Sequence, residues 1–279
     1  MTTCRKKILA AALIFALWIV FLPYSGFAAE QTLGQTYYID QLEGSDENSG
    51  TSENALWKTL EKVNETVFEP GDTICFKSGG QWVGQLNPKG SGTESAPITI
   101  TSYGSGEKPH IAGNGTTDTA LLLFNQQYWE IDGIEVSNTG GTTGDFRGIG
   151  LKGVDAGVLR HIYIRNCYVH DVTGEVIYFG SNDTSYENGK RTGGIIFWTD
   201  TVNGIPTYFE DVVIENNEIC YNAFSGIGFK QTNKEGWALR EGGYYDPNWM
   251  PHRQITVQNN YFEQNDPENQ RVPLLFTSV

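Results

Sequence analysis

The sequence predicts an all-β solenoid, in which short strands stack as successive turns of one coil. A strand-like segment recurs four times with the same pattern of apolar and polar residues, and no helix of useful length separates the copies. Glycine is abundant, at 33 of 279 residues, against a usual share of about 7%. Hydrophobic residues make up 39% and aromatic residues 13% of the chain, which provides a core and argues against intrinsic disorder.

The four copies of the repeat align on the apolar positions Ile131, Ile164, Ile214 and Val257. Apolar and polar residues alternate in each copy, and Gly or Asn stands at the bend, a pattern typical of short strands. These anchors are 33, 50 and 43 residues apart, so the extra residues are expected in loops between strands. We therefore expect the four anchors to lie directly over one another in successive turns.

The bends of the repeat carry Asn166, Asn216 and Asn259. Side-chain amides both donate and accept hydrogen bonds, so we expect these three residues to stack in one column along the coil. The alternative fold is an antiparallel sandwich, but Asn-Gly hairpin signals are few, at 114–115, 188–189 and 203–204, which gives that fold little support.

A second series of glycine-rich strands is interleaved with the first. Period-two alternation predicts that one set of its side chains points into the core and that their neighbours point outward. The residues expected inside are Ile149, Leu151, Ile195, Phe197, Ile227 and Phe229.

Residues 1–29 have the pattern of a secretory signal peptide. Arg5, Lys6 and Lys7 precede an apolar run from 8 to 22, and small residues follow it. The alternative is a retained membrane anchor, because the run could be extended to a length that spans a bilayer. With cleavage, we expect a protein that is secreted to the medium or cell surface and does not touch the membrane.

The mature domain is predicted to cover residues 30–279. Its N-terminal part, 37–70, is interpreted as a cap for the exposed apolar end of the coil, with a short capping helix over 55–67, where apolar residues have helical spacing. The coil itself is expected over 71–279. Because the chain stops within the apolar strand 272–276, the coil is predicted to be incomplete at its C-terminus.

Three cysteines remain in the mature domain, Cys75, Cys167 and Cys220. Their odd number and wide spacing do not form a disulfide framework or a zinc motif. We expect them to be buried as small apolar residues, with a single disulfide as the alternative.

The mature chain resembles secreted bacterial right-handed parallel β-helix proteins of the pectate-lyase-like superfamily. The residues that carry the resemblance in the N-terminal part are 38–40, 44–46, 48–51, 57–60, 70–74, 97–100, 103–104 and 108–111, and downstream copies such as 213–217 resemble the parallel β-helix repeat. The resemblance implies a right-handed parallel β-helix and carbohydrate chemistry. The superfamily includes polysaccharide lyases and glycoside hydrolases, so the resemblance does not choose between these reactions.

A candidate substrate surface follows from the alternation of the second strand series. The column expected to point outward is Lys152, Trp198 and Lys230. An exposed indole stacks on the apolar face of a sugar ring, and cations bind hydroxyls or uronate carboxylates. In the alternative interpretation, the lysines are ordinary solvated side chains and the loop 200–209 covers Trp198.

Candidate catalytic residues lie in the loops that flank these strands. Glycoside hydrolysis needs two carboxyl groups, for which we propose Asp171, Glu175 and Asp200. Elimination from a uronide needs a cation instead, for which the two lysines or Arg147 and Arg191 are candidates. His170 completes the predicted substrate-binding set. In the alternative interpretation, these charges solvate loops or pair with one another.

A weak calcium site is predicted at Asp46 and Asn48, which place oxygen ligands at alternate positions, although an Asx-rich turn explains the pattern equally well. The formal charge of −14 argues against binding nucleic acid. The leading hypothesis is a monomeric, cofactor-independent hydrolase of a plant or microbial polysaccharide. The alternatives are a calcium-dependent pectate-type lyase and a non-catalytic glycan-binding or adhesin solenoid.

Overall fold

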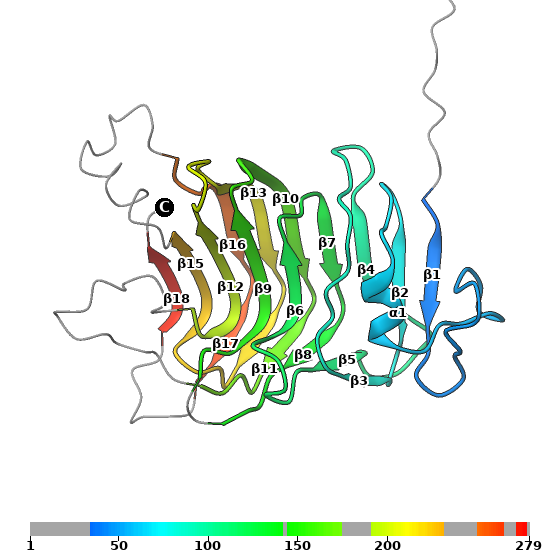
Figure 1. The fold of residues 1–279 in the computed structure, drawn as a ribbon. Coiled ribbons are helices and arrows are strands. Elements are labelled where there is room, and N and C mark those ends of the chain that lie inside the picture. Colours follow the sequence, from blue (N-terminus) through cyan, green and yellow to red (C-terminus); the bar gives the residue numbers. More distant parts are fainter. Residues whose placement is uncertain (1–33, 142–143, 175–190, 232–249, 265–271, 278–279) are drawn as a thin grey trace, which may run out of the picture. The chain divides into compact units, whose positions relative to one another are not determined.

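The computed structural model describes residues 34–141, 144–174, 191–231, 250–264 and 272–277 (Figure 1). The predicted signal peptide, 1–29, lies outside the described residues. Among the helices in the described ranges, none combines the length and the apolar character that crossing a bilayer requires.

Strands account for nearly all of the regular structure and form three parallel sheets. The seven-stranded sheet consists of β1 (Thr36–Ile39), β2 (Thr73–Lys77), β4 (Ile98–Tyr103), β7 (Trp129–Asp132), β10 (Val158–Arg165), β13 (Tyr208–Glu215) and β16 (Arg253–Gln258). The six-stranded sheet consists of β3 (Gln81–Val83), β5 (His110–Ala112), β8 (Glu135–Ser137), β11 (Tyr168–His170), β14 (Glu218–Cys220) and β17 (Tyr261–Glu263). The five-stranded sheet consists of β6 (Thr119–Phe124), β9 (Arg147–Val154), β12 (Gly193–Asp200), β15 (Ser225–Gln231) and β18 (Val272–Thr277).

From β7 onward the chain visits the three sheets in turn, so that each strand lies beside the strand three places earlier (Figure 1). The strand pairings in the described residues are parallel, which rules out the antiparallel sandwich. This arrangement is consistent with a parallel β-helix.

The anchors of the repeat lie in register, as predicted. Ile164 pairs with Ile131 on one side and with Ile214 on the other, and Ile214 pairs with Val257. Ile131, Ile164 and Ile214 are completely buried. In the five-stranded sheet, the side chains expected inside are also buried, and Phe197 stacks on Phe229 with ring centroids 4.5 Å apart.

The predicted capping helix is wrong. The structure has a single helical segment there, α1 (Leu60–Glu65), of only six residues. Residues before it are extended: Trp57 forms a bridge with Ile39, and its N–H donates to the carbonyl of Tyr38 at 2.9 Å. The N-terminal edge of the seven-stranded sheet is therefore formed by β1 and the Trp57 segment, not by a helix.

Local hydrogen bonds explain why α1 is short. The Thr59 side chain caps its N-terminus by accepting from the Lys62 N–H at 3.2 Å. At its other end, Thr66 is extended, with ψ of 136°. The apolar spacing over 55–67 suggested a longer helix, but Trp57 lies in an extended segment. It is apolar because its ring stacks on Tyr37, with ring centroids 4.7 Å apart.

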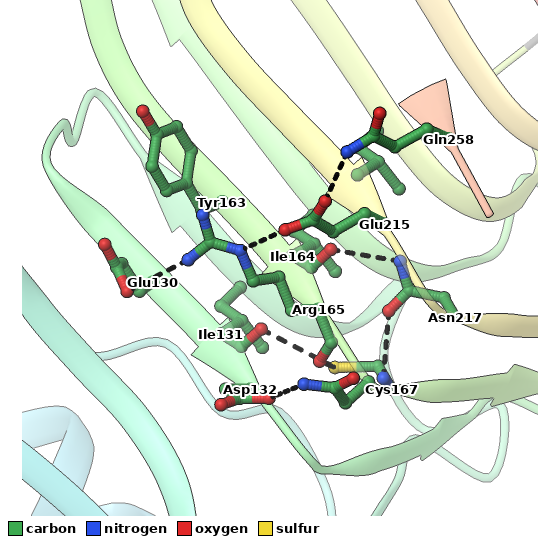
Figure 2. Close-up of polar contacts among 12 residues, drawn as sticks. Glu130, Ile131, Asp132, Tyr163, Ile164, Arg165, Cys167, Glu215, Asn217 and Gln258 are labelled. Atoms are coloured by element: carbon green, nitrogen blue, oxygen red, sulfur yellow. Dashed lines mark hydrogen bonds and ion pairs between the residues drawn. The ribbon is translucent and has the colours of Figure 1, made fainter. Parts of the chain in front are cut away.

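The side-chain amide column at the bend is one residue later than predicted. Asn166, Asn216 and Asn259 take left-handed backbone conformations, with φ of 52°, 58° and 55°, which Asn tolerates better than most residues. Asn166 donates to Asp132 Oδ1 of the preceding turn at 2.7 Å, but the hydrogen bond from one side-chain amide to the next belongs to the residues that follow these three. Asn217 donates to Ile164 O at 3.0 Å (Figure 2). It also donates to Asn260 Oδ1 at 2.9 Å.

Polar side chains link the turns on the seven-stranded sheet as well. Arg165 lies between two carboxylates, with Nη1 3.3 Å from Glu130 Oε2 and Nε 2.8 Å from Glu215 Oε1 (Figure 2). Gln258 donates to the second oxygen of Glu215 at 2.6 Å. Both carboxylates are engaged in these contacts between turns. We therefore assign a structural role to this group of side chains, which stabilises the stacking of the turns.

The three cysteines expected in the mature domain are free and buried, as predicted, and the disulfide alternative is wrong. Burial raises the pKa of Cys167 to about 12, so its thiol stays protonated and packs as an apolar group.

Candidate functional site

The five-stranded sheet brings the predicted column of Lys152, Trp198 and Lys230 into register. Trp198 of β12 pairs with Lys152 of β9 and with Lys230 of β15. These residues alternate with the buried positions 151, 197 and 229, so they share the opposite face of the sheet. We call this the Trp198 face, and it includes Arg147 at the start of β9, whose guanidinium carbon lies 4.8 Å from the centroid of the Trp198 ring.

The expectation of an exposed Trp198 is wrong, because only 4% of this residue is exposed. Glycine at position 150 leaves space on the sheet, and a Cβ atom there would lie 3.0 Å from Cζ3 of the indole ring. The ring therefore lies against β9. Lys152 is within cation–π distance, with Nζ 5.9 Å from the ring centroid. Lys230 is also buried, with 6% exposed.

Arg147 is the centre of an ion-pair network at the start of β9. Its side chain is 5% exposed, with Nη1 2.8 Å from Asp145 Oδ2 and Nη2 3.0 Å from Asp118 Oδ2. It also donates from Nε to Thr119 Oγ1 at 3.0 Å and from Nη1 to the carbonyl of Arg191 at 3.1 Å. The guanidinium is thus held in one orientation beside Trp198.

A second arginine lies between two carboxylates in the same network. Arg191 Nε lies 3.8 Å from Asp145 Oδ2, and Nη1 lies 3.8 Å from Asp200 Oδ2. Burial lowers the pKa of Arg191, and the two carboxylates partly offset that effect. The side chains of Asp145 and Asp200 are 24% and 28% exposed, so both are accessible from solvent.

The positions of Asp145 and Asp200 suit the chemistry of glycosidic bonds. Glycosidases use two carboxyl groups roughly 5 to 10 Å apart as acid and as base or nucleophile, and Asp145 and Asp200 both lie beside the guanidinium of Arg191. Asp145 is further fixed by a hydrogen bond of 2.8 Å from Thr192 Oγ1. Of the predicted site residues, the structure brings together Arg147, Lys152, Arg191, Trp198, Lys230 and Asp200.

The predicted catalytic Asp171 belongs to a different group of side chains. It follows β11 in the six-stranded sheet, and its Oδ2 lies 2.8 Å from Nδ1 of His170. Nε2 of His170 in turn lies 3.0 Å from Glu135 Oε1. Glu175, the third predicted carboxylate, lies outside the described residues. The set of Asp171, Glu175 and Asp200 therefore stays a prediction.

The side chains of Asp46 and Asn48 are engaged in hydrogen bonds within the N-terminal segment. Asp46 accepts from the N–H groups of Lys58 and Thr59 at 2.8 and 3.1 Å and from the Thr59 hydroxyl at 2.7 Å. These hydrogen bonds lower the pKa of Asp46 against the effect of burial. Asn48 donates to the carbonyl of Leu56 at 2.9 Å. The calcium prediction gains no support, and the Asx-turn interpretation accounts for both residues.

Sequence reasoning did not select Asp118, Asp145 or Glu135 as site residues. Asp118 and Asp145 lie just before strands, in segments without a repeating pattern. The stacking of β6 on β9 brings Asp118 to Arg147, whereas Asp145 lies only two residues before Arg147 in the chain. A charged pair directly before the second strand series, Asp145 and Arg147, was the available signal in the sequence.

No family model matches the chain. Among curated proteins, it is 28% identical to a lacto-N-biosidase of Bifidobacterium longum subsp. longum over 256 residues, covering 69% of this chain and 15% of the relative. It is 34% identical to alpha-1,3-galactosidase A of Akkermansia muciniphila over 64 residues, covering 23% of this chain and 11% of the relative.

Among solved structures, the chain is similar to the GH136 lacto-N-biosidase of Eubacterium ramulus. The TM-score is 0.68 at 25% sequence identity, over 82% of this chain and 41% of that one. The chain thus spans less than half the length of the relatives that it matches. These comparisons show a fold like that of the Eubacterium enzyme over most of the chain.

Proposed function

We propose that this chain forms part of a secreted glycoside hydrolase that acts on an oligosaccharide. The observation that carries the proposal is the likeness to the Eubacterium lacto-N-biosidase, which extends over 82% of the chain at a TM-score of 0.68. A curated lacto-N-biosidase supports it independently from sequence. Among the reactions left open by the sequence, hydrolysis is therefore favoured over elimination.

For the substrate, we propose a lacto-N-bioside in place of the plant or microbial polysaccharide expected from sequence. The names of the Bifidobacterium and Eubacterium proteins favour this choice. The glycosidase named for alpha-1,3-galactosides matches a much smaller part of the chain, 23%, so an α-galactoside is the second candidate substrate.

For the catalytic groups, we propose Asp200 and Asp145. Both carboxylates contact Arg191 and are accessible from solvent, and hydrolysis with an acid and a base or nucleophile needs two such groups. Arg147 and Trp198 position this pair, since Arg147 contacts both Asp145 and the indole ring.

The test is a panel of three substrates: a chromogenic lacto-N-bioside, a chromogenic α-galactoside and polygalacturonate. The proposal expects release of the chromophore from the lacto-N-bioside. A product from polygalacturonate that absorbs in the ultraviolet would show elimination and overturn it. Binding of a lacto-N-bioside without turnover would support the non-catalytic alternative instead.

The proposed secretion rests on the signal-like segment 1–29. The test is N-terminal sequencing of protein collected from the culture medium, where we expect the chain to begin near residue 29 or 30. Recovery of the chain with an intact N-terminus in the membrane fraction would contradict secretion and indicate the anchor.

A further inference from the structure

Three neighbouring strands of the six-stranded sheet carry a group of ligand-type side chains that the proposed hydrolysis does not use. His110 lies on β5, Glu135 on β8 and His170 on β11. Their ligand atoms all lie within 4.8 Å of one another. In the part of the chain that the structure describes, this is the one group of three or more His, Cys, Asp or Glu side chains that converges in this way.

The strand register explains why these side chains meet. His110 and Glu135 occupy directly opposed positions on β5 and β8, and His170 lies opposite Ser137, two residues beyond Glu135. Positions two residues apart share a face of the sheet. The completely buried Ile111, Val136 and Val169 are each the sequence neighbour of one of the three and point into the core, so the three ligand-type side chains share the outward face.

The two distances from the Glu135 carboxylate to the imidazoles fit a four-coordinate zinc ion. Glu135 Oε1 lies 3.0 Å from His170 Nε2 and 3.6 Å from His110 Nδ1. Zinc–ligand bonds of about 2.0–2.1 Å at tetrahedral angles put neighbouring ligand atoms roughly 3.3 Å apart, midway between these two distances.

The second ring nitrogen of each histidine has a hydrogen-bond partner, as is usual for histidines that bind a metal. His170 Nδ1 lies 2.8 Å from the carboxylate of Asp171, and His110 Nε2 lies 2.8 Å from the Ser137 hydroxyl. Such outer partners fix the tautomer and the ring orientation and leave the other nitrogen free to bind a metal. Tyr168 also holds His170, since their rings stack with centroids 4.0 Å apart.

We propose that His110, Glu135 and His170 form a zinc site. The three side chains are 20%, 24% and 12% exposed, so an ion can enter and a water molecule can complete its coordination. Two imidazoles and one carboxylate with an open fourth position form a donor set that suits Zn²⁺. The ion would tie three successive turns of the coil together.

The test is calorimetric titration of the chelator-treated full chain with Zn²⁺, together with the metal content of the protein after dialysis. We expect one zinc ion per chain and an increase in the unfolding temperature when zinc is added. Replacement by Co²⁺ should give the intense visible absorption of a four-coordinate ion. No binding, or a Co²⁺ spectrum of six-coordinate type, would overturn the proposal.

Substitution of the proposed ligands tests where the zinc ion binds. His110→Ala, Glu135→Gln and His170→Ala should each weaken zinc binding by more than 100-fold, and Asp171→Asn by about 10- to 100-fold. The matched control is His161→Ala, because His161 also lies between two carboxylates, 3.0 Å from Glu130 and 3.2 Å from Asp211. Zinc binding that survives all four site variants, or that is lost equally in the control, would contradict the assignment.

Two measurements separate this proposal from failed folding and from the proposed hydrolase. Each variant is first unfolded thermally without metal, and a cooperative transition shows that it is folded. The zinc measurements involve no glycoside, so an inactive chain that binds zinc refutes only the hydrolase, and an active chain without zinc refutes only the metal site.

Discussion

The indole ring of Trp198 occupies the space that Gly150 leaves on the neighbouring strand. A Cβ atom at Gly150 would lie 3.0 Å from Cζ3 of the ring and 2.7 Å from Cγ2 of Thr119. Gly150→Ala should therefore displace the ring and lower the free energy of unfolding by about 1–3 kcal/mol, the usual cost of overpacking. Urea denaturation measures this change. In the Trp198→Leu background the same substitution should cost less, because only the clash with Thr119 then remains. An equal cost in both backgrounds would show that the ring is not responsible.

Arg147 is held by two aspartates while almost completely buried. Replacing it by Met leaves Asp145 without its shortest ion pair, so we expect a loss of about 2 kcal/mol in the free energy of unfolding, reduced from the full buried-pair value because Asp118 is largely exposed. Arg160→Met is the control. Arg160 is 42% exposed and 3.7 Å from Glu210, and its loss should cost less than about 0.5 kcal/mol.

Asp200 is predicted from the sequence to be catalytic and is one of the two carboxylates proposed for catalysis above. Asp200→Asn keeps the size of the side chain but removes its ability to transfer a proton or attack a sugar. On the lacto-N-bioside, kcat should fall by about 100-fold or more, with no change in the unfolding temperature beyond a few degrees. Asp211→Asn, at a carboxylate bound to Tyr163 on the seven-stranded sheet, should leave kcat unchanged. Equal kcat values for the two variants would remove Asp200 from the mechanism.

The buried amide of Asn217 satisfies backbone groups of the preceding turn. It accepts from Cys167 N–H at 2.9 Å and donates to Ile164 O at 3.0 Å. Asn217→Ala leaves both groups unpaired and should cost about 3 kcal/mol. Its neighbour Asn216 has φ of 58°, which glycine adopts readily, so Asn216→Gly should cost less than about 1 kcal/mol. Chemical denaturation compares the two variants, and the reverse order of stability would contradict this account of the bend.

His252 makes stability depend on pH. It is buried, and the Phe209 N–H donates to its Nδ1 at 3.0 Å, so the native state needs the neutral ring. Burial lowers its pKa from 6.5 to about 4. The unfolded chain therefore binds the proton first, and the stabilisation present above pH 6.5 is lost as the pH falls through 4.

The expected loss attributable to His252 is about 3 kcal/mol between neutral pH and pH 3. His252→Asn keeps an acceptor for the Phe209 N–H but does not titrate in this range. Urea denaturation of both proteins across the pH range isolates the contribution, because other groups titrate equally in each. Parallel stability curves for the two proteins would show that His252 is not the titrating group.

The stacking of the turns could be predicted because each copy of the repeat has an apolar residue at the same position. Ile131, Ile164 and Ile214 are apolar at equivalent positions, and burial of each requires the others. The capping helix could not be predicted correctly, because Trp57 and Leu60 have helical spacing while Trp57 packs as an extended residue on Tyr37. In the amide column, Asn216 and Asn217 are adjacent and chemically identical, so only their backbone conformations distinguish their roles.

The candidate site could be predicted only in part. The alternation of apolar and polar residues fixes the register of the strands in the five-stranded sheet. The row of Lys152, Trp198 and Lys230 could therefore be predicted. Burial of Trp198 depends on the glycine at 150 of the neighbouring strand, which the sequence does not mark as a contact. The partners of Arg147 come from segments before two different strands, and no fixed spacing joins them.

The unequal distances between the aligned anchors have a practical consequence. The ladder from Ile131 to Val257 keeps its partners although the intervening segments differ in length, so connector length and turn stacking are separable properties of this chain. A foreign peptide inserted between β13 and β14 would interrupt the bend at Asn216 and Asn217. An insertion that leaves the stacked bends intact should therefore leave the scaffold folded.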